Sequence, residues 1–501
     1  PSQPCHMLLL GIDIGTSSVK VSVVDGETQQ PVASASYPET EAPIMRLQPG
    51  WAEQEPTDWW DRFVMAYQQI LQTKKFDPAA IGAIGIAYQM HGLVLIDKAG
   101  AVLRPSIIWC DSRAIAYGDQ ANQALGPDYC LSHYLNAPGN FTAAKLAWVK
   151  ENEPHIYAQA DKLLLPGDYI AFRMTGTVTS SAAALSEGVL WDFSSSSPAE
   201  KLMNYFGFDP ALLPTVQPVF STHGSLSANV AALLQCKAGI PVSYKAGDQP
   251  NNALSLGVME PGEIAATAGT SGVIYAVSDS LGFDPLSRVN SFAHVNHAAA
   301  DPRIGILLCI NGTGILYSWA KRQWATTVSY HELNALAAQS PAGSRGLSVL
   351  PFGNGAERLL LNKQTGVVFA GIDLNQHNQA DLFRALQEGI AFSFRYGLDI
   401  MRSNGLAPTI IKAGNSNLFQ SDVFLQSFVG ATGVPVSLYQ TDGSVGAALG
   451  AGIGAGYYAT PQQAFQQQSA IRTCTPDEVP VLDEAYQRWL DLLHKNLPNY
   501  V

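Results

Sequence analysis

The chain has 501 residues, of which 47% are hydrophobic and 14% are charged, enough for about two to four domains with buried cores. Its 29 basic and 41 acidic side chains give a formal net charge of −12, which excludes a broad electrostatic attraction to nucleic acid or to anionic membranes. No tract of biased composition interrupts the sequence, so a globular protein is favoured over a disordered one. The negative net charge does not exclude a phosphate-binding site at one place in the protein.

The cysteines and the start of the chain favour a cytoplasmic location. None of the six cysteines has the CxxC spacing or the neighbouring histidine of a zinc site, and free thiols are typical of the reducing cytoplasm. No signal-peptide pattern is visible, and the Gly- and Ala-rich stretch 443–459 is too short and too rich in glycine to span a membrane. Residues 1–6 resemble an expression-vector remnant ahead of Met7.

In chain order, the first predicted elements form a β-hairpin. Apolar strands over 8–13 and 19–24 flank Asp13-Ile14-Gly15-Thr16-Ser17-Ser18, a tight turn that carries glycine and hydroxyl groups. A helix over 58–72 follows, with Thr57 as its predicted N-cap. The other predicted elements of this half are strands over 81–87 and 93–97 and helices over 142–151 and 167–174.

The second half of the chain begins in the same way as the first. A predicted strand over 242–246 leads through Gly247-Asp248 into a helix over 251–257, and strands over 262–267 and 273–277 flank Gly269-Thr270-Ser271-Gly272. The arrangement of strand, hydroxyl turn and strand therefore recurs about 254 positions after its first appearance. Strands that alternate with helices predict an α/β protein of two domains, 7–245 and 246–501, with the ligand in an interdomain cleft.

The turn after the first strand is a candidate phosphate site. Glycine lets the backbone approach an anion, and turn amides and hydroxyls donate to phosphate oxygens. Asp13 beside the turn is a candidate ligand of Mg²⁺, which prefers a few carboxylates and retained waters. The alternative is an ordinary hairpin turn whose side chains cap their own backbone. The second turn, at 269–272, favours a nucleoside triphosphate as the ligand.

Three further segments carry groups that suit catalysis or recognition. Asp248 starts a predicted helix, where its carboxylate either accepts the proton of a hydroxyl that attacks phosphorus or serves as a helix cap. Gln89-Met90-His91-Gly92 offers polar groups to sugar hydroxyls, although a lone histidine is more often simply buried. Asp111 and Arg113 have the spacing of a local salt bridge. The polar turn 414–417 admits a flat base or is only a loop.

Taken together, these segments resemble the FGGY family of carbohydrate kinases over about residues 8–460. Each motif is short, and the order and separation of the motifs carry the resemblance. Within the family, Gln89-Met90-His91-Gly92 and Trp109-x-Asp111-x-Arg113 look like the xylulose kinases. The other matching segments are Gly11-Ile12-Asp13-Ile14-Gly15-Thr16-Ser17-Ser18-Val19-Lys20, Thr142-x2-Lys145-Leu146-x-Trp148-Val149-x-Glu151-Asn152, Gly247-Asp248, and Phe369-Ala370-Gly371-Ile372 with Asp381-Leu382-x2-Ala385 and Glu388.

The resemblance implies two actin-like, ribonuclease-H-like domains that bind ATP and a sugar. It also implies phosphorylation of a ketopentose, with D-xylulose as the expected acceptor. Kinases of gluconate, ribulose or sedoheptulose are alternatives within the family, and an actin-like ATPase without a sugar acceptor is an alternative outside it. Two places depart from the xylulose kinase pattern, the segment 184–188 and Gln249. Family members often form dimers, so a homodimer is a further expectation.

The resemblance also assigns roles to individual residues. Asp248 is the expected catalytic base, and Asp13 is the expected ligand of Mg²⁺. The expected sugar-binding residues are Gln89, Met90, His91, Trp109, Asp111, Asp248 and Gln249. The expected ATP-binding residues are Thr16, Ser17, Ser18, Lys20, Gly269, Thr270, Ser271, Gly312, Gly414 and Asn417.

Overall fold

The computed structural model describes residues 6–497, so residues 1–5 of the expected vector remnant lie outside the described part. The chain forms two compact units, each assembled from more than one segment. Unit 1 extends to Met259 and takes in Phe292–Arg303 and Thr441–Gln468. Unit 2 consists of Glu260–Ser291, Ile304–Gln440 and the chain from Ser469 onward.

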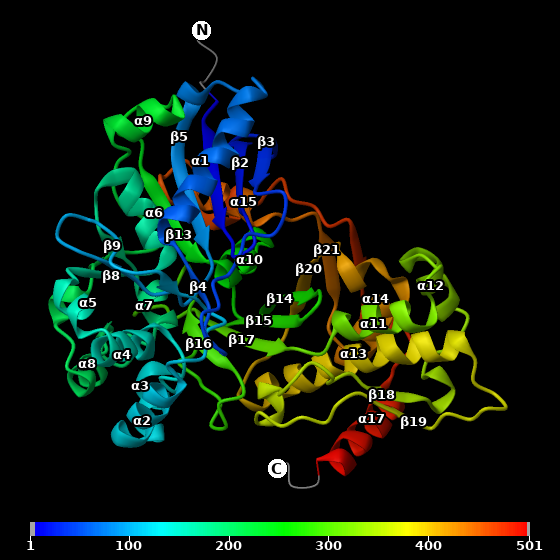
Figure 1. The fold of residues 1–501 in the computed structure, drawn as a ribbon. Helices are drawn as coiled ribbons and strands as arrows, with labels where there is room; N and C mark the ends of the chain where they lie inside the picture. Colours follow the sequence, from blue (N-terminus) through cyan, green and yellow to red (C-terminus); the bar gives the residue numbers. More distant parts are fainter. Residues whose placement is uncertain (1–5, 498–501) are drawn as a thin grey trace. The chain divides into compact units, whose positions relative to one another are not determined.

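Unit 1 is built on a five-stranded sheet in the order β13-β5-β1-β2-β3 (Figure 1). β1 (Leu8–Ile14), β2 (Val19–Asp25) and β3 (Pro31–Tyr37) pair antiparallel. β5 (Ile81–Tyr88) lies parallel to β1, and β13 (Val242–Gly247) lies parallel to β5. Parallel strands end at the same edge of a sheet, so the residues that follow β1, β5 and β13 lie near one another.

Helices cover both faces of this sheet (Figure 1). α1 (Pro56–Gln72) and α6 (Pro166–Thr175) pack against each other on one face, while α10 (Asp248–Ser255) and α15 (Gly443–Gly454) pack on the other. The other elements of unit 1 are short. They are β4 (Glu53–Gln54), β6 (Val94–Ile96), β7 (Ser106–Ile107), α2 (Ile115–Leu125), α3 (Pro127–Tyr134), α4 (Thr142–Asn152), α5 (Pro154–Gln159), β8 (Lys162–Leu164), β9 (Thr179–Ser180), α7 (Ala182–Glu187), β10 (Trp191–Asp192), β11 (Ser197–Pro198), α8 (Glu200–Phe206), β12 (Thr215–Val216), α9 (Ala228–Leu234) and α16 (Pro461–Ala464).

Glycines let α15 lie directly on the backbone of the sheet. A Cβ at Gly11 would stand 1.8 Å from the carbonyl oxygen of Ser444, and one at Gly85 would stand 2.0 Å from that of Ala447. Both oxygens belong to the helix backbone, so no side-chain rotation can relieve such a clash. The close contact explains why α15 belongs to unit 1 although it follows a long stretch of unit 2 in the chain.

Unit 2 is built on a seven-stranded sheet in the order β16-β17-β15-β14-β20-β21-β22. β14 (Glu263–Ala268), β15 (Gly272–Ser278) and β17 (Ile304–Ile310) pair antiparallel. β20 (Ile410–Gly414) lies parallel to β14, and β21 (Val436–Tyr439) lies parallel to β20. The other elements are β16 (Asn290–Ala293), α11 (Gly314–Trp324), α12 (Tyr330–Ala337), β18 (Ser348–Leu350), β19 (Val368–Ala370), α13 (Gln379–Ser403), α14 (Asp422–Thr432), β22 (Arg472–Cys474) and α17 (Asp483–Asn496).

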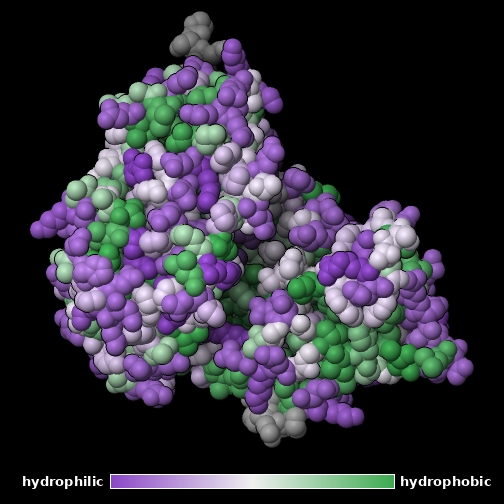
Figure 2. Space-filling view, in the orientation of Figure 1, coloured by the Kyte–Doolittle hydropathy of each residue, from purple (hydrophilic) through white to green (hydrophobic). Residues whose placement is uncertain are grey.

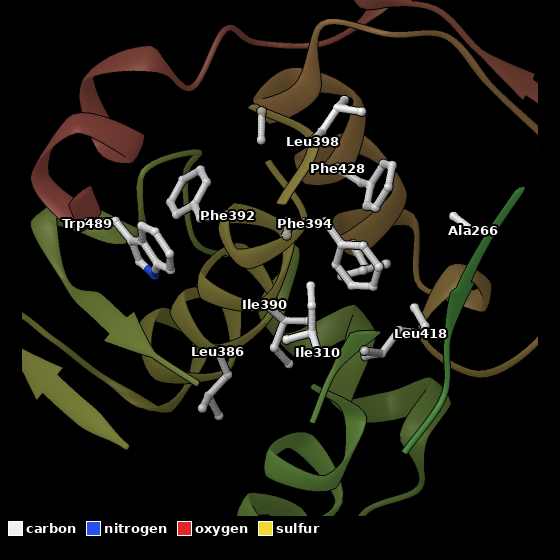
Figure 3. Close-up of a cluster of buried hydrophobic side chains, with 14 of the residues drawn as sticks. Ala266, Ile310, Leu386, Ile390, Phe392, Phe394, Leu398, Leu418, Phe428 and Trp489 are labelled. Carbon is white, nitrogen blue, oxygen red and sulfur yellow. The ribbon is translucent and has the colours of Figure 1, made fainter. Parts of the chain in front are cut away.

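The long helix α13 is the centre of the core of unit 2 (Figure 3). On one side its Phe394 packs against Phe428 of α14, with 5.2 Å between ring centroids. On another side its Phe392 packs against Trp489 of α17, with 6.2 Å between centroids. Because α13 buries aromatic side chains in two directions, it holds α14 and α17 in one core.

The five strands of the first sheet and five of the seven strands of the second share one connectivity, which confirms the α/β class with two actin-like domains. In each sheet, three antiparallel strands are followed by two parallel ones, and both hydroxyl turns join the first strand to the second. The units divide after Met259 rather than after residue 245, since β13 pairs with β5 and α10 packs on α15. The N-cap predicted at Thr57 is wrong: α1 begins at Pro56 after Glu55, and proline is favoured in the first helical turn.

Within residues 6–497, no helix is long and apolar enough to cross a membrane. The face drawn in Figure 2 is mainly hydrophilic, with hydrophobic residues scattered over it. The described cysteines form no disulfide; they are Cys110, Cys130, Cys236, Cys309 and Cys474.

Because α15 packs directly on the backbone of the sheet, we expect one methyl group added at this contact to lower the stability of the protein. Gly11→Ala should lower the free energy of unfolding by about 1–3 kcal/mol or more, because the new Cβ meets backbone that cannot move aside. Gly282→Ala is the matched control, since its nearest neighbour would be the Ser280 hydroxyl at 3.4 Å. Denaturation curves of the two variants measure the difference, and equal stability would contradict the tight packing.

Candidate active site

The turn between β1 and β2 presents two hydroxyls that make no hydrogen bond within the described residues. The amide of Gly15 donates to the carbonyl of Ser18 at 3.0 Å, which closes the turn. The Thr16 hydroxyl is already engaged, because it accepts from Trp109 Nε1 at 2.9 Å and lies 3.5 Å from Gln89 Oε1. The hydroxyls of Ser17 and Ser18 are therefore the ones left to donate to an incoming anion.

Two carboxylates lie at the carboxyl ends of β1 and β13. Asp248 is the first residue of α10 after the N-cap Gly247, and the backbone amides of Asp248 and Gln249 act to lower the pKa of its carboxyl. Burial raises the pKa of Asp248 to about 7, and the negative charge of Asp13 adds to the rise. Asp13 and Asp248 are nevertheless partly exposed residues, and a group that contacts a substrate must be accessible.

Asp13 also lies near the charged side chains of Lys20 and Asp442. Burial raises the pKa of Asp13 to about 6, with the charge of Asp442 adding to the rise and that of Lys20 opposing it. The Lys20 ammonium forms an ion pair with Asp442, so the structure differs from the prediction of a lysine left for phosphate. A Cβ at Gly443 would stand 2.7 Å from Asp13 Oδ2, so glycine there leaves space beside the carboxylate.

Gln89 and Met90 follow directly after β5. Gln89 Nε2 donates to the carbonyl of Gly15 at 3.3 Å and to Gln54 Oε1 at 3.1 Å, so it supports the hydroxyl turn. Met90 is buried and packs on Gly247, where a Cβ would stand 2.6 Å from Met90 Cγ. Gln89 therefore lies beside the turn that follows Asp13, and Met90 lies beside the residue that precedes Asp248.

His91 is held by several residues that the sequence did not assign to the site. Its ring packs on Phe141 and Phe292, with centroids 4.8 and 5.6 Å away. Its Nδ1 lies 2.9 Å from the carbonyl oxygen of Glu187. Burial, aided by the charge of Lys145, lowers the pKa of His91 to about 3. The sequence offered a signal for two of these residues. Lys145 lies in a segment that resembles a family motif, and Glu187 lies in the segment 184–188, which departs from the xylulose kinase pattern.

Asp111 has no free carboxylate oxygen for a sugar. The side chain is fully buried, pairs with Arg113 at 2.7 Å and accepts from the amide of Ala52 at 2.6 Å. The Arg113 guanidinium lies over Trp51 and Trp148, 3.8 and 4.8 Å from their ring centroids. Asp111 therefore shapes the loop that presents the exposed Trp109, in place of the direct contact that the sequence predicted.

A pocket of about 360 Å³ opens in unit 2, within the usual size range of ligand sites. The rings of Tyr317 and Tyr330 stack beside it with centroids 6.0 Å apart. Tyr317 donates to Asn334 Oδ1 at 2.7 Å. Flat aromatic walls and an amide suit a planar heterocycle. The lining includes Gly269, Thr270, Tyr317, Tyr330, Asn334 and Asn417.

The hydroxyl turn of unit 2 is fixed to the start of α11. The amide of Gly314 donates to the carbonyl of Gly269 at 3.0 Å, and a Cβ at Gly314 would stand 2.2 Å from that oxygen. Of the residues expected to bind ATP here, Gly269, Thr270 and Asn417 line the pocket. Ser271, Gly312 and Gly414 are not among its lining, and the Gly312 amide already donates to the buried Glu357 at 2.9 Å.

Comparisons with known proteins point to one family. The N-terminal domain model of the FGGY family of carbohydrate kinases matches residues 8–255, and its C-terminal domain model matches residues 264–459. The xylulose kinase of Escherichia coli K12 is 31% identical over 467 residues, which cover 91% of each chain. The crystal structure of xylulose kinase from Rhodospirillum rubrum superposes with a TM-score of 0.87 at 27% identity, covering 98% of this chain and 99% of the other. Gluconate kinase from Lactobacillus acidophilus shares the fold, with a TM-score of 0.87 at 21% identity and 99% of both chains covered.

Because Asp111 is buried, we expect its replacement to lower the stability of the protein rather than to remove a direct contact with the sugar. Asp111→Asn should lower the free energy of unfolding by about 1–3 kcal/mol, because it removes the carboxylate that pairs most closely with the buried Arg113 and leaves Glu53, at 3.4 Å, as its remaining carboxylate partner. The control is Asp301→Asn, which removes an exposed partner of Arg303 and should change stability by about 0.5 kcal/mol or less. Thermal denaturation without ligand measures both; unchanged stability in Asp111→Asn would contradict a structural role for the Asp111 carboxylate.

Proposed function

Because the chain belongs to the FGGY family of carbohydrate kinases, we propose that it phosphorylates a ketopentose, and D-xylulose above all, to D-xylulose 5-phosphate. ATP is the phosphoryl donor of this family. The observation that carries the proposal is the carboxylate of Asp248, with its pKa raised to about 7, beside Met90 at the end of the neighbouring strand. The names of the xylulose kinases that match over most of the chain support D-xylulose as the acceptor.

Asp248 acts as the base. Its carboxylate accepts the proton of the terminal hydroxyl as the hydroxyl oxygen attacks the γ-phosphorus, and the bond from phosphorus to the bridging oxygen of ADP breaks. A pKa near 7 lets the group be deprotonated at neutral pH and still hold a proton well. Most of the acceleration then comes from positioning and from stabilisation of charge on the transferred group.

The sugar is held in unit 1 by residues around the end of β5. Met90 provides an apolar contact beside Gly247, His91 and Gln249 provide polar ones, and Trp109 provides an exposed indole face, as in many sugar sites. Asp111 acts indirectly through Arg113, and Gln89 acts through Thr16, since their polar atoms are taken up within the protein.

In unit 2, the groups proposed to bind the nucleotide are the hydroxyl turn 269–272 and the pocket beside it. The base stacks in the pocket beside Tyr330, with Asn417 close to Gly269, and amides and hydroxyls of 269–271 donate to phosphate oxygens. In unit 1, the proposed phosphate donors are the hydroxyls of Ser17 and Ser18. Lys20 contributes through its ion pair with Asp442, which offsets charge around Asp13.

Mg²⁺ fits the oxygen donors of Asp13. No group of three or more His, Cys, Asp or Glu side chains among residues 6–497 is arranged to hold a metal alone, but Mg²⁺ usually takes one or two carboxylates and keeps waters and phosphates as other ligands. The space beside Gly443 and the unfavourable burial of the Asp13 charge both suit a cation at this carboxylate. Bound there, the ion would neutralise phosphate charge.

The acceptor is tested by a coupled assay of ADP formation with a panel of sugars. The panel contains D-xylulose, L-xylulose, D-ribulose, L-ribulose, gluconate, sedoheptulose and glycerol, beside a blank without sugar. D-xylulose is expected to give the highest kcat/KM. Gluconate is the second candidate, because a gluconate kinase shares the fold over 99% of both chains. No stimulation by any sugar would favour an ATPase. A homodimer and a cytoplasmic location stay predictions.

Replacement of the base should abolish turnover and leave binding. Asp248→Asn is expected to lower kcat for the sugar by about a hundredfold or more, since the amide cannot accept the proton, while sugar affinity in calorimetry changes little. Asp301→Asn, at an exposed position, should keep wild-type turnover. Near-normal kcat in Asp248→Asn would remove this residue from the chemistry.

The raised pKa of Asp248 also predicts a pH profile. Only the deprotonated carboxylate accepts a proton, so kcat/KM for the sugar should fall as the pH drops below about 7 and should level off above it. Asp13, with its pKa raised to about 6, titrates in the same region, so the acid limb belongs to the pair. Initial rates from pH 5 to 9 measure this, and a rate that is flat down to about pH 5 would contradict it.

A further inference from the structure

His91 adopts a backbone conformation that its side chain does not favour. Its φ is +70°, in the left-handed region that residues other than glycine seldom enter. Such a conformation persists only where the surrounding structure holds it, and it is concentrated at functional sites. The groups that hold His91 are therefore part of the construction of the site.

Glu187, the last residue of α7, makes three contacts that fix this conformation. Its Oε2 accepts from the backbone amide of His91 at 2.8 Å, and its Oε1 accepts from the Tyr88 hydroxyl at 2.5 Å. Its backbone carbonyl lies 2.9 Å from His91 Nδ1. From the other side, the His91 carbonyl accepts from Thr142 Oγ1 at 3.0 Å and from Lys145 Nζ at 3.1 Å. Both backbone polar groups of His91 are thus satisfied.

These contacts also decide which nitrogen of the imidazole carries the proton. A carbonyl oxygen only accepts hydrogen bonds, so Nδ1 must be the donor, and the lone pair lies on Nε2. The pKa of His91, lowered to about 3 by burial, keeps the ring neutral at neutral pH. Nε2 makes no hydrogen bond within the described residues, and 15% of the His91 side chain is exposed.

We propose that Glu187 is a positioning residue of the sugar site: it holds His91 so that Nε2 accepts a hydrogen bond from a sugar hydroxyl. This inference rests on the proposed function. It assigns a purpose to the segment 184–188, where the sequence departs from the xylulose kinase pattern. A neutral acceptor aimed at a hydroxyl discriminates against analogues that lack that hydroxyl, because Nε2 would then be desolvated without a partner.

The experiment compares Glu187→Ala with Glu187→Gln, using the sugar that is most active with the wild-type enzyme. Glu187→Ala should raise the KM of the sugar about tenfold or more, while the KM of ATP stays within about twofold of the wild-type value. Glutamine keeps a carbonyl oxygen that can accept from the His91 amide, and its side-chain NH₂ can donate to the Tyr88 oxygen. Glu187→Gln should therefore restore the sugar KM to within about threefold of wild type.

A double-mutant cycle separates positioning from general stability. If Glu187 acts through His91, then Glu187→Ala should cause no further rise in sugar KM when His91→Ala is already present. The matched control is Glu388→Ala in unit 2, another buried glutamate that accepts from a backbone amide and a hydroxyl, those of Gly343 and Ser344. It should lower stability without changing the sugar KM. An unchanged sugar KM in Glu187→Ala, or an undiminished effect beside His91→Ala, would overturn the proposal.

A measurement on the free wild-type enzyme keeps the test independent of the kinetic constants and of the substrate. Nitrogen-15 NMR of labelled histidine, with His91→Asn to identify the signal, should show a neutral ring protonated at Nδ1 without any sugar. A ring protonated at Nε2, or a charged ring at pH 7, would overturn the proposal. Failure of every sugar in the panel would instead refute the proposed function, whatever tautomer is found.

Discussion

The burial of two carboxylates at one edge of a sheet is the constraint on which the site of unit 1 depends. Asp13 lies near the end of β1 and Asp248 follows β13, the two strands that flank β5, and burial raises the pKa of the two groups to about 6 and 7. Such burial costs stability, and it is common at sites where a group exchanges a proton near neutral pH, the role proposed for Asp248. The ion pair of Lys20 with Asp442 offsets part of the charge. Because Asp442 immediately precedes α15, that helix must lie against β1 for the site to exist.

The hydroxyl turn of unit 1 and the loops that carry Trp109 and Gln89 form one hydrogen-bonded assembly. Thr16 contacts Trp109 and Gln89, and Gln54 donates to the carbonyl of Thr16 at 2.9 Å. The residues expected to bind phosphate and those expected to bind sugar formed separate sets, yet Thr16 of the first set hydrogen-bonds to Trp109 and Gln89 of the second. A change in the Trp109 loop therefore acts on the turn that is proposed to meet the phosphates.

The sequence predicted the parts of the site that lie within single strands and turns. Both hydroxyl turns join antiparallel strands as expected, and Asp248 does begin a helix, because strand periodicity and turn chemistry are local properties. The pairing of Lys20 with Asp442 was missed, since these residues are 422 positions apart. Glu187 was noticed only as a departure from a pattern, because its contact with the His91 amide follows from how α7 packs beside β5. The stacked Tyr317 and Tyr330 had no sequence signal either.

The titration of Asp248 is the measurement that tests the central claim most directly. Difference infrared spectroscopy of the free enzyme from pH 4 to 9, with Asp248→Asn as the reference, isolates the carboxyl band of this residue. A band that titrates near pH 7 and is missing in the variant is expected from the burial of Asp248 and the neighbouring charge of Asp13. A band that titrates near the usual value of about 4 for aspartate would contradict the assignment of Asp248 as a base poised for proton transfer.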